Sequence, residues 1–222
     1  MPSNNYPMPF TRVELCVLGL SEAGVEVLLA RREQAPEKGK WALPGGVLRI
    51  DLDEDLPGAA QRVALERLGT RLPGLQLLAA TGGKGRDPRA PWTLSIAYRA
   101  MARAESLQVT PGKRVESLQW FDADTAAGDT SGLAFDHGAV IALALAHLRD
   151  EIDDLVLPFE LLPPEFTLGE LQRACEVLLG RPLDKSSFRR RLDDRQNVEP
   201  VPGAMRGAAH RPAQVYRRRE PA

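Results

Sequence analysis

KWALPGGVLRIDLDEDLPGAAQRVALERLGT, residues 40–70, contains a Pro-Gly-Gly turn, an acidic loop and an apolar-periodic segment, in that order. Between Leu56 and Leu68, alanine, valine and leucine recur at spacings of three and four residues. Side chains at these spacings share one face of a helix, so the segment predicts a helix with one face packed on a core. Gly69 is a natural stop for that helix. The stretch therefore predicts a helix that follows a glycine-rich turn and a charged loop.

Short apolar runs on both sides of this stretch predict strands. Apolar and polar residues alternate in two runs before it, and further runs follow it, together with a second helix. The expected strands cover residues 10–20, 25–31, 75–81, 92–102 and 115–121, and the second helix covers residues 137–150. Several strands with few helices predict an α+β fold built in layers.

The composition is that of an ordinary globular protein with one large or two small domains. The chain has 222 residues, of which 43% are hydrophobic and 27% charged. Cys16 and Cys175 are far apart and form no CxxC pair, which argues against a disulfide framework and a zinc site. The N-terminus lacks the features of a secretory signal, and no apolar run approaches the roughly 18 residues that span a bilayer. We therefore expect a cytoplasmic protein with no membrane partner.

The formal charge is distributed unevenly along the chain. From Arg181 to Arg219 there are eleven basic and four acidic residues, a net charge of +7, whereas the whole chain has −1. The remainder therefore carries −8. A basic end on an acidic body favours a polyanionic partner for that end, although a solubilising basic terminus is an equal alternative on charge alone.

The last third of the chain shows local signals for a separate small domain. Three prolines interrupt residues 151–165, which predicts a linker. Thr167 and Glu170 have the spacing of a capping box, and an apolar stripe follows as far as Gly180. Asp184 can cap a second short helix, and two short extended segments close the chain. Two helices followed by a hairpin predict a winged helix-turn-helix.

In that interpretation the helix from Lys185 to Asp194 enters the major groove of DNA, and the hairpin lies over phosphate or the minor groove. Basic side chains can hold phosphates or read guanine edges, and a plain surface role is an alternative for each arginine. The candidate DNA-binding residues are Thr167, Lys185, Ser186, Ser187, Arg189, Arg190, Arg206, His210 and Arg211.

Residues 46–69 resemble the Nudix box, whose helix carries glutamates around a metal ion. When the chain is aligned on Gly69, the glycine near the end of the box, Arg62 takes the place of the family's arginine. Glu66 takes the place of the first of the two adjacent glutamates that precede this glycine. The other two helix glutamate places hold Val63 and Arg67, and the interval before the arginine is two residues longer than the family pattern. The resemblance therefore extends to the position of the helix but only to part of its chemistry.

Helix geometry explains what this loss means. Glutamates at positions 63, 66 and 67 would converge on one metal site, because residues three and four apart share a face. Magnesium prefers oxygen ligands, clamps a diphosphate and helps to activate the attacking water. Because Glu66 is the residual carboxylate, we expect no catalytic residue and no metal site. We expect a requirement for Mg²⁺ only if hydrolase activity remains. The acidic loop 51–55 could supply a displaced ligand, but a solvated charged loop is the alternative.

Several residues near the box are candidates for binding a nucleotide. Trp41 could stack on an adenine or could simply pack on the protein. Planar guanidinium groups suit phosphate oxygens, which makes nearby arginines candidates for the diphosphate. Asp136 is expected to cap the helix that begins at His137, and Asp87 could hold a structural turn. The candidate ligand-binding residues are Arg32, Trp41, Arg49, Glu66, Arg86 and Arg89.

Together these segments resemble the Nudix-related transcriptional regulators of NAD metabolism, the NrtR family. The matching stretches are GKWALPGG, DLDEDL followed by AAQR, RDPR, LAFDH, FTLGELQRACEVLLGRPLDKSSFRRRL and RPAQVYR. The resemblance implies a Nudix-like α/β/α sandwich over residues 1–152, a linker at 153–164 and a winged helix domain over 165–222. It also implies a homodimer that binds operator DNA, senses ADP-ribose or a related nucleotide as effector, requires no cofactor, and mostly represses genes of NAD biosynthesis or salvage.

Two other functions remain open from the residues. The first is a magnesium-dependent ADP-ribose pyrophosphatase in which Glu66 and Glu54, or a neighbour, hold the metal. The second is an RNA- or protein-binding module that uses the basic end, although the lack of aromatic residues among these arginines disfavours single-strand binding.

Overall fold

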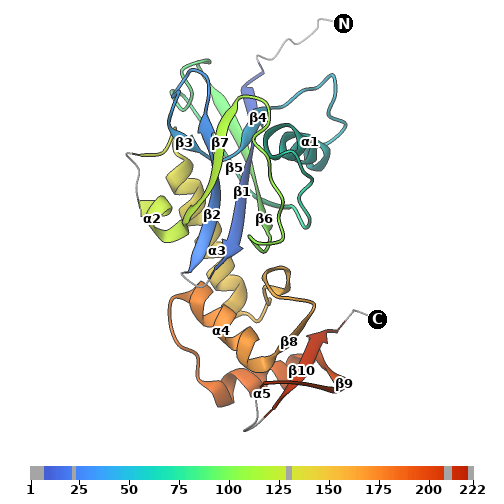
Figure 1. Ribbon diagram of the computed structural model, residues 1–222. Helices are drawn as coiled ribbons and strands as arrows, with labels where there is room; N and C mark the ends of the chain where they lie inside the picture. The colour runs from blue at the N-terminus through green and yellow to red at the C-terminus, as the bar shows by residue number, and fades with distance from the viewer. Residues whose placement is uncertain (1–7, 22–23, 129–131, 208–211, 220–222) are drawn as a thin grey trace, which may run out of the picture.

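The computed structural model describes residues 8–21, 24–128, 132–207 and 212–219. Its larger part is a seven-stranded mixed sheet in the order β3-β2-β1-β6-β5, with β4 paired to β1 and β7 paired to β2 (Figure 1). β1 and β6 run parallel, and the other pairs are antiparallel. The strands are β1 (Phe10–Leu20), β2 (Val25–Arg32), β3 (Trp41–Ala42), β4 (Gly45–Val47), β5 (Gln76–Gly83), β6 (Thr93–Met101) and β7 (Val115–Asp122).

Helices cover both faces of this sheet, because side chains along a strand alternate between its faces. Val13, Leu15 and Val17 of β1 join the core beneath α1 (Leu56–Leu68). Cys16 and Leu18 point to the opposite face, into the core beneath α2 (Ala123–Gly128) and α3 (His137–Asp153). The expected α/β/α sandwich is therefore confirmed.

Local caps set the ends of α1. The carboxylate of Asp55 accepts a hydrogen bond of 2.7 Å from the backbone N–H of Gly58. At the other end Gly69 adopts φ 70°, a left-handed conformation that favours glycine. The helix consequently occupies the residues predicted from its periodicity.

The C-terminal part is a winged helix. Its elements are a short 3-10 helix η1 (Phe159–Leu161), β8 (Glu165–Thr167), α4 (Leu168–Leu179), α5 (Lys185–Arg195), β9 (Val198–Arg206) and β10 (Ala213–Arg218). The strands form a sheet in the order β8-β10-β9. The capping box of Thr167 and Glu170 is present, and Phe188 and Leu192 of α5 are buried. The winged helix-turn-helix prediction is confirmed.

α3 connects the two parts of the molecule, and Figure 1 shows it passing from the sheet toward α4. Arg149 donates from Nε to the carbonyl of Leu178 at 3.1 Å. Asp153 forms an ion pair with Arg181, and its carbonyl accepts from Arg191. The predicted linker buries four leucines in a hydrophobic cluster that runs from the sheet into the winged helix, namely Leu155, Leu157, Leu161 and Leu162. The two parts therefore share packed contacts rather than a loose tether.

Some elements differ from the sequence predictions. β3, β4 and β8 have two or three residues, too few to show an alternating pattern, and they exist because neighbouring strands pair with them. α2 was also not predicted, and α3 runs to Asp153, past the expected end at residue 150. Among the described residues, no helix is long and apolar enough to cross a membrane.

Candidate functional site

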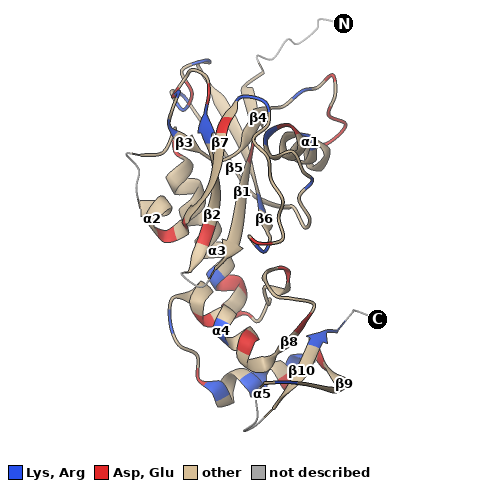
Figure 2. Cartoon of the chain, in the orientation of Figure 1, with Lys and Arg blue, Asp and Glu red and all other residues tan. Residues whose placement is uncertain are grey.

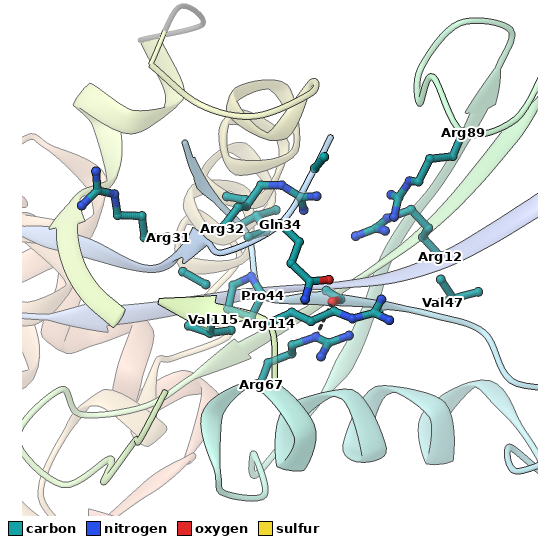
Figure 3. A pocket seen from close by; sticks show the side chains of 16 residues that line it. Arg12, Arg31, Arg32, Gln34, Pro44, Val47, Arg67, Arg89, Arg114 and Val115 are labelled. Carbon is teal, nitrogen blue, oxygen red and sulfur yellow. Dashed lines mark hydrogen bonds between the residues drawn. The ribbon is translucent and has the colours of Figure 1, made fainter. Parts of the chain in front are cut away.

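A pocket with an unusual lining opens beside β1, β2 and the C-terminal end of α1. None of its lining residues is acidic, and six are arginines: Arg12, Arg31, Arg32, Arg67, Arg89 and Arg114. Figure 3 shows Arg31 pointing away from the pocket, whereas the guanidinium groups of the other labelled arginines turn toward one another. Arg31 instead donates to Glu116 at 3.2 Å. Guanidinium groups that gather in this way can bind a multiply charged anion, although Arg89 is already paired with Asp87.

Glycines allow the chain to approach these arginines closely. A Cβ atom on Gly45 would lie 3.2 Å from Nη2 of Arg12, and one on Gly46 would lie 2.8 Å from Val63. The carbonyl of Gly45 accepts a hydrogen bond of 2.8 Å from Nε of Arg67. Both glycines of the predicted Pro-Gly-Gly turn therefore lie in the short strand β4, which forms one wall of the pocket.

Phe135 lies against the arginines of the opposite wall. The guanidinium carbon of Arg32 is 5.0 Å from the centre of its ring, and that of Arg12 is 5.8 Å away. Burial, together with the charges of Arg12 and Arg89, lowers the pKa of Arg32 to about 10. The group stays protonated at neutral pH, and a bound anion would offset this mutual repulsion.

Beneath Arg12, a buried polar cluster ties the sheet to the start of α3. Ser95 donates to Glu14 at 3.0 Å, and Nε2 of His137 lies 3.4 Å from the same carboxylate oxygen. Nδ1 of His137 accepts the backbone N–H of Leu43 at 2.8 Å, next to the glycine turn. Burial alone would raise the pKa of Glu14, but His137, Arg12 and Ser95 outweigh it and lower the pKa to about 2.

This cluster predicts a specific acid sensitivity. The pKa of Glu14 falls from 4.5 to about 2 on folding, so its contribution to stability is present above pH 4.5 and is lost as pH falls toward 2. We expect Glu14→Gln to be less stable at neutral pH and to lose less stability than the wild type between those two pH values. Urea unfolding at a series of pH values measures this difference. Parallel pH profiles for both proteins would show that Glu14 does not contribute in this way.

The structure brings two of the predicted ligand-binding residues, Arg32 and Arg89, to the pocket. It places the other four outside the lining. The ring of Trp41 packs edge-on against Phe121 at 4.8 Å, and Arg49 is exposed and paired with Asp51.

Arg86 and Glu66 are also held by protein groups. Arg86 makes a two-pronged contact with Asp136 at 2.6 and 2.8 Å. Asp136 therefore does not form the predicted side-chain cap of α3, because its carboxylate is used by this more distant partner. Glu66 accepts from Arg62 at 3.2 Å.

Three arginines of the pocket, Arg12, Arg67 and Arg114, were not among the predicted ligand-binding residues. Arg12 and Glu14 are charged residues inside an otherwise apolar strand, a signal that could have indicated a buried polar cluster. Arg67 was noted only as the replacement for a glutamate. Arg114 lies in the loop before β7, where nothing local indicates a pocket.

The second candidate surface is α5 of the winged helix. Lys185 and Arg189 lie one helical turn apart and border a groove that is also lined by Thr167 and β10. Among the described residues, Lys185, Arg189 and Arg190 form no side-chain hydrogen bond or ion pair. Figure 2 shows basic residues along α5 and at the end of β10. These exposed cations are available to the phosphates of a nucleic acid.

The other predicted DNA-binding residues differ in their exposure and in their hydrogen-bond partners. Ser186 is exposed and Ser187 half-buried at the start of α5. The hydroxyl of Thr167 accepts from the backbone N–H of Glu170 at 3.1 Å, and Arg206 pairs with the same glutamate at 3.0 Å. His210 and Arg211 lie outside the described residues.

Comparison with known proteins relates both surfaces to one family. The family model for the NrtR DNA-binding winged helix domain matches residues 158–218, and that for the NUDIX domain matches residues 11–143. The ADPR responsive transcriptional repressor NtrR of Acinetobacter baylyi is 35% identical over 214 residues, covering 96% of this chain and 84% of the relative. The chain belongs to the NrtR family of Nudix-related transcriptional regulators.

Solved NrtR structures agree with this assignment. Shewanella oneidensis NrtR complexed with a 27mer DNA is 28% identical, covers 94% of this chain and 93% of its own, and has a TM-score of 0.76. The NUDIX domain of the same NrtR complexed with ADP ribose is 25% identical, with a TM-score of 0.59 over 67% of this chain and 94% of that one. The two-domain NrtR architecture therefore extends over nearly the whole chain.

In this NrtR-family chain the Nudix helix does not fit a magnesium ion. Val63 is fully buried against Gly46, and Arg67 is a cation at a ligand position. Three carboxylates of the nearby acidic loop already have partners, since Asp51 pairs with Arg49, Asp53 with Arg62, and Asp55 caps α1, whereas Glu54 is exposed. Among the described residues, no group of three or more His, Cys, Asp or Glu side chains gathers as a metal site.

Proposed function

We propose that this protein is a DNA-binding repressor of NAD biosynthesis or salvage genes, controlled by ADP-ribose. In this proposal the Nudix-like domain binds the effector, and the winged helix domain of a cytoplasmic homodimer binds palindromic operator DNA. The observation that carries the proposal is the presence, in one chain, of an arginine-lined pocket without lining carboxylates and a helix, α5, on which Lys185, Arg189 and Arg190 have no side-chain partner among the described residues.

The chemistry of the pocket supports a diphosphate as its occupant. ADP-ribose carries two linked phosphates, and planar guanidinium groups can donate paired hydrogen bonds to phosphate oxygens. Arg12, Arg32 and Arg67 come from separate elements but face one space (Figure 3). The relative from Acinetobacter baylyi is named as an ADPR responsive repressor, which agrees with this choice of effector.

The contacts of α5 support duplex DNA as the partner of the winged helix. A helix of 11 residues presents Lys185 and Arg189 on one face and buries Phe188 and Leu192 on another. This is the division expected of a recognition helix, with one face on the protein and one on the major groove. The solved relative bound to a 27mer DNA matches across this domain.

The competing function, a magnesium-dependent ADP-ribose pyrophosphatase, has less support. That reaction needs a metal to clamp the diphosphate and to activate water, and Val63 and Arg67 stand where two of its carboxylate ligands would be. Glu66 is paired with Arg62, and among the described residues neither Glu54 nor Glu66 belongs to a group of three or more side chains that could hold a metal ion.

The test is a gel shift with DNA from the promoter region of the protein's own gene, with random DNA of equal length as the control. We expect selective retardation of the promoter fragment, and we expect ADP-ribose to release it. Equal binding to both fragments would contradict the assignment as an operator-binding repressor. Selective binding that ADP-ribose does not change would contradict the choice of effector.

A further inference from the structure

Arg67 is held rigidly at the edge of the pocket, at the position where the Nudix box would place a metal-binding glutamate. Its Nε donates to the carbonyl of Gly45 at 2.8 Å, and its Nη1 donates to the carbonyl of Lys113 at 2.7 Å. Its side chain is 10% exposed. Two backbone acceptors on separate segments therefore fix the plane of the guanidinium group before any ligand binds.

The same contacts leave part of the group free for a ligand. A guanidinium carries five N–H donors, and neither N–H of Arg67 Nη2 takes part in a hydrogen bond among the described residues. The residue lines the pocket together with Arg12 and Arg114, and Figure 3 shows its guanidinium beside that of Arg114. Burial lowers the pKa of Arg67, which indicates that its charge is poorly solvated in the absence of an anion.

An arginine in place of the glutamate of the Nudix box reverses the sign of the charge at this position. A carboxylate repels a phosphate unless a divalent cation lies between them, whereas a guanidinium binds the phosphate directly. The nearest carboxylate, Glu66, lies 3.9 Å from Nη1 of Arg67 and is also shared with Arg62. The site is therefore built for an anion rather than for a metal ion.

We propose that Arg67 is a fixed cation that replaces magnesium in effector recognition, so that this protein binds the diphosphate of its effector without a metal. This inference rests on the proposed function and adds to it the means by which the diphosphate is held. A guanidinium can neutralise the phosphates, but it does not supply the metal-bound water that hydrolysis needs. The same substitution thus gives binding without cleavage.

The experiment measures binding by calorimetry with the full chain, using ADP-ribose and, separately, inorganic pyrophosphate. Each titration is done with EDTA and again with excess Mg²⁺. We expect the wild type to bind each ligand in the presence of EDTA, so that neither ligand requires Mg²⁺ for binding. Arg67→Gln, which keeps a donor for the carbonyl of Gly45, should bind about tenfold to a hundredfold more weakly, as the loss of a charged hydrogen bond implies.

Two further variants separate a ligand contact from a structural role. Arg67→Glu restores a carboxylate at the metal-ligand place, so its residual binding should become stronger with Mg²⁺, an effect that simple loss of packing does not produce. Arg103→Gln is the matched control, because that arginine lies outside the pocket lining and pairs with Glu105. It should bind like the wild type, and the thermal unfolding of each variant reports its folding.

The outcomes distinguish this inference from the proposed function. Binding of pyrophosphate that Arg67→Gln weakens, without any binding of ADP-ribose, would retain Arg67 as the fixed cation and reject ADP-ribose as effector. Wild-type binding that requires Mg²⁺, or a folded Arg67→Gln that binds as tightly as the wild type, would overturn the inference. So would a wild type that binds neither ligand.

Discussion

Replacing both Lys185 and Arg189 with alanine is expected to weaken binding to the operator by about a hundredfold. Both side chains border the groove between α5, β10 and the start of α4, and neither has a partner among the described residues. Their removal therefore exposes no unpaired internal group, and the loss falls on contacts with DNA. Fluorescence anisotropy with labelled operator, over a range of salt concentrations, measures the effect.

The salt dependence identifies the kind of contact that is lost. If both residues hold phosphates, the slope of log affinity against log salt should become shallower by about 1.8, because each phosphate contact contributes about 0.9. If they read bases, the double variant should discriminate less between operator and random DNA. Arg103→Ala, an arginine paired with Glu105 in the Nudix-like domain, is the control. A double variant with unchanged operator affinity would exclude α5 as the recognition helix.

Replacing Phe135 with leucine is expected to separate effector binding from DNA binding. The ring touches Arg12 and Arg32 in the pocket. The next two residues, Asp136 and His137, are the N-cap and the first residue of α3. A helix of 17 residues is about 25 Å long, and its far end contacts Leu178 of α4 through Arg149. We expect phosphates to draw the two arginines away from the ring, so that the start of α3 loses a contact and the helix carries the shift to the winged helix.

Leucine keeps the apolar bulk of Phe135 but has no ring for the guanidinium groups. The variant should still bind ADP-ribose and operator separately, while the effect of one ligand on the other falls from the typical range of about 5-fold to 150-fold toward unity. Anisotropy with and without ADP-ribose gives this ratio. Phe121→Leu, the same change on a ring that packs against Trp41 outside the pocket lining, should retain the wild-type ratio. Undiminished coupling in Phe135→Leu would exclude this route.

Those parts of the fold that depend on local chemistry could be predicted from the sequence. α1 lies where its periodicity placed it, because Asp55 and Gly69 determine its ends within the segment itself. The same holds for α4, whose capping box joins Thr167 to a residue three positions away. Longer strands were also predictable, since alternation over eight or more residues reports the two faces of a sheet.

The pocket could be predicted only in part, because distant segments build it. Arg12, Arg67 and Arg114 reach the same space through strand pairing and helix packing, which no local pattern reports. Asp136 shows the same limit, because a partner 50 residues away takes the carboxylate that a local rule assigned to a helix cap. Trp41 stood next to the glycine turn in sequence, but its ring turned to Phe121 instead.

The most direct test of the account is calorimetry of ADP-ribose binding to this chain, free and saturated with operator DNA. If the effector releases the repressor from DNA, operator must weaken ADP-ribose binding by the same factor by which ADP-ribose weakens operator binding. We predict that, without added metal, the factor by which operator weakens ADP-ribose binding in calorimetry equals the factor by which ADP-ribose weakens operator binding in anisotropy. ADP-ribose that binds with the same affinity to the free protein and to the DNA complex would contradict the account.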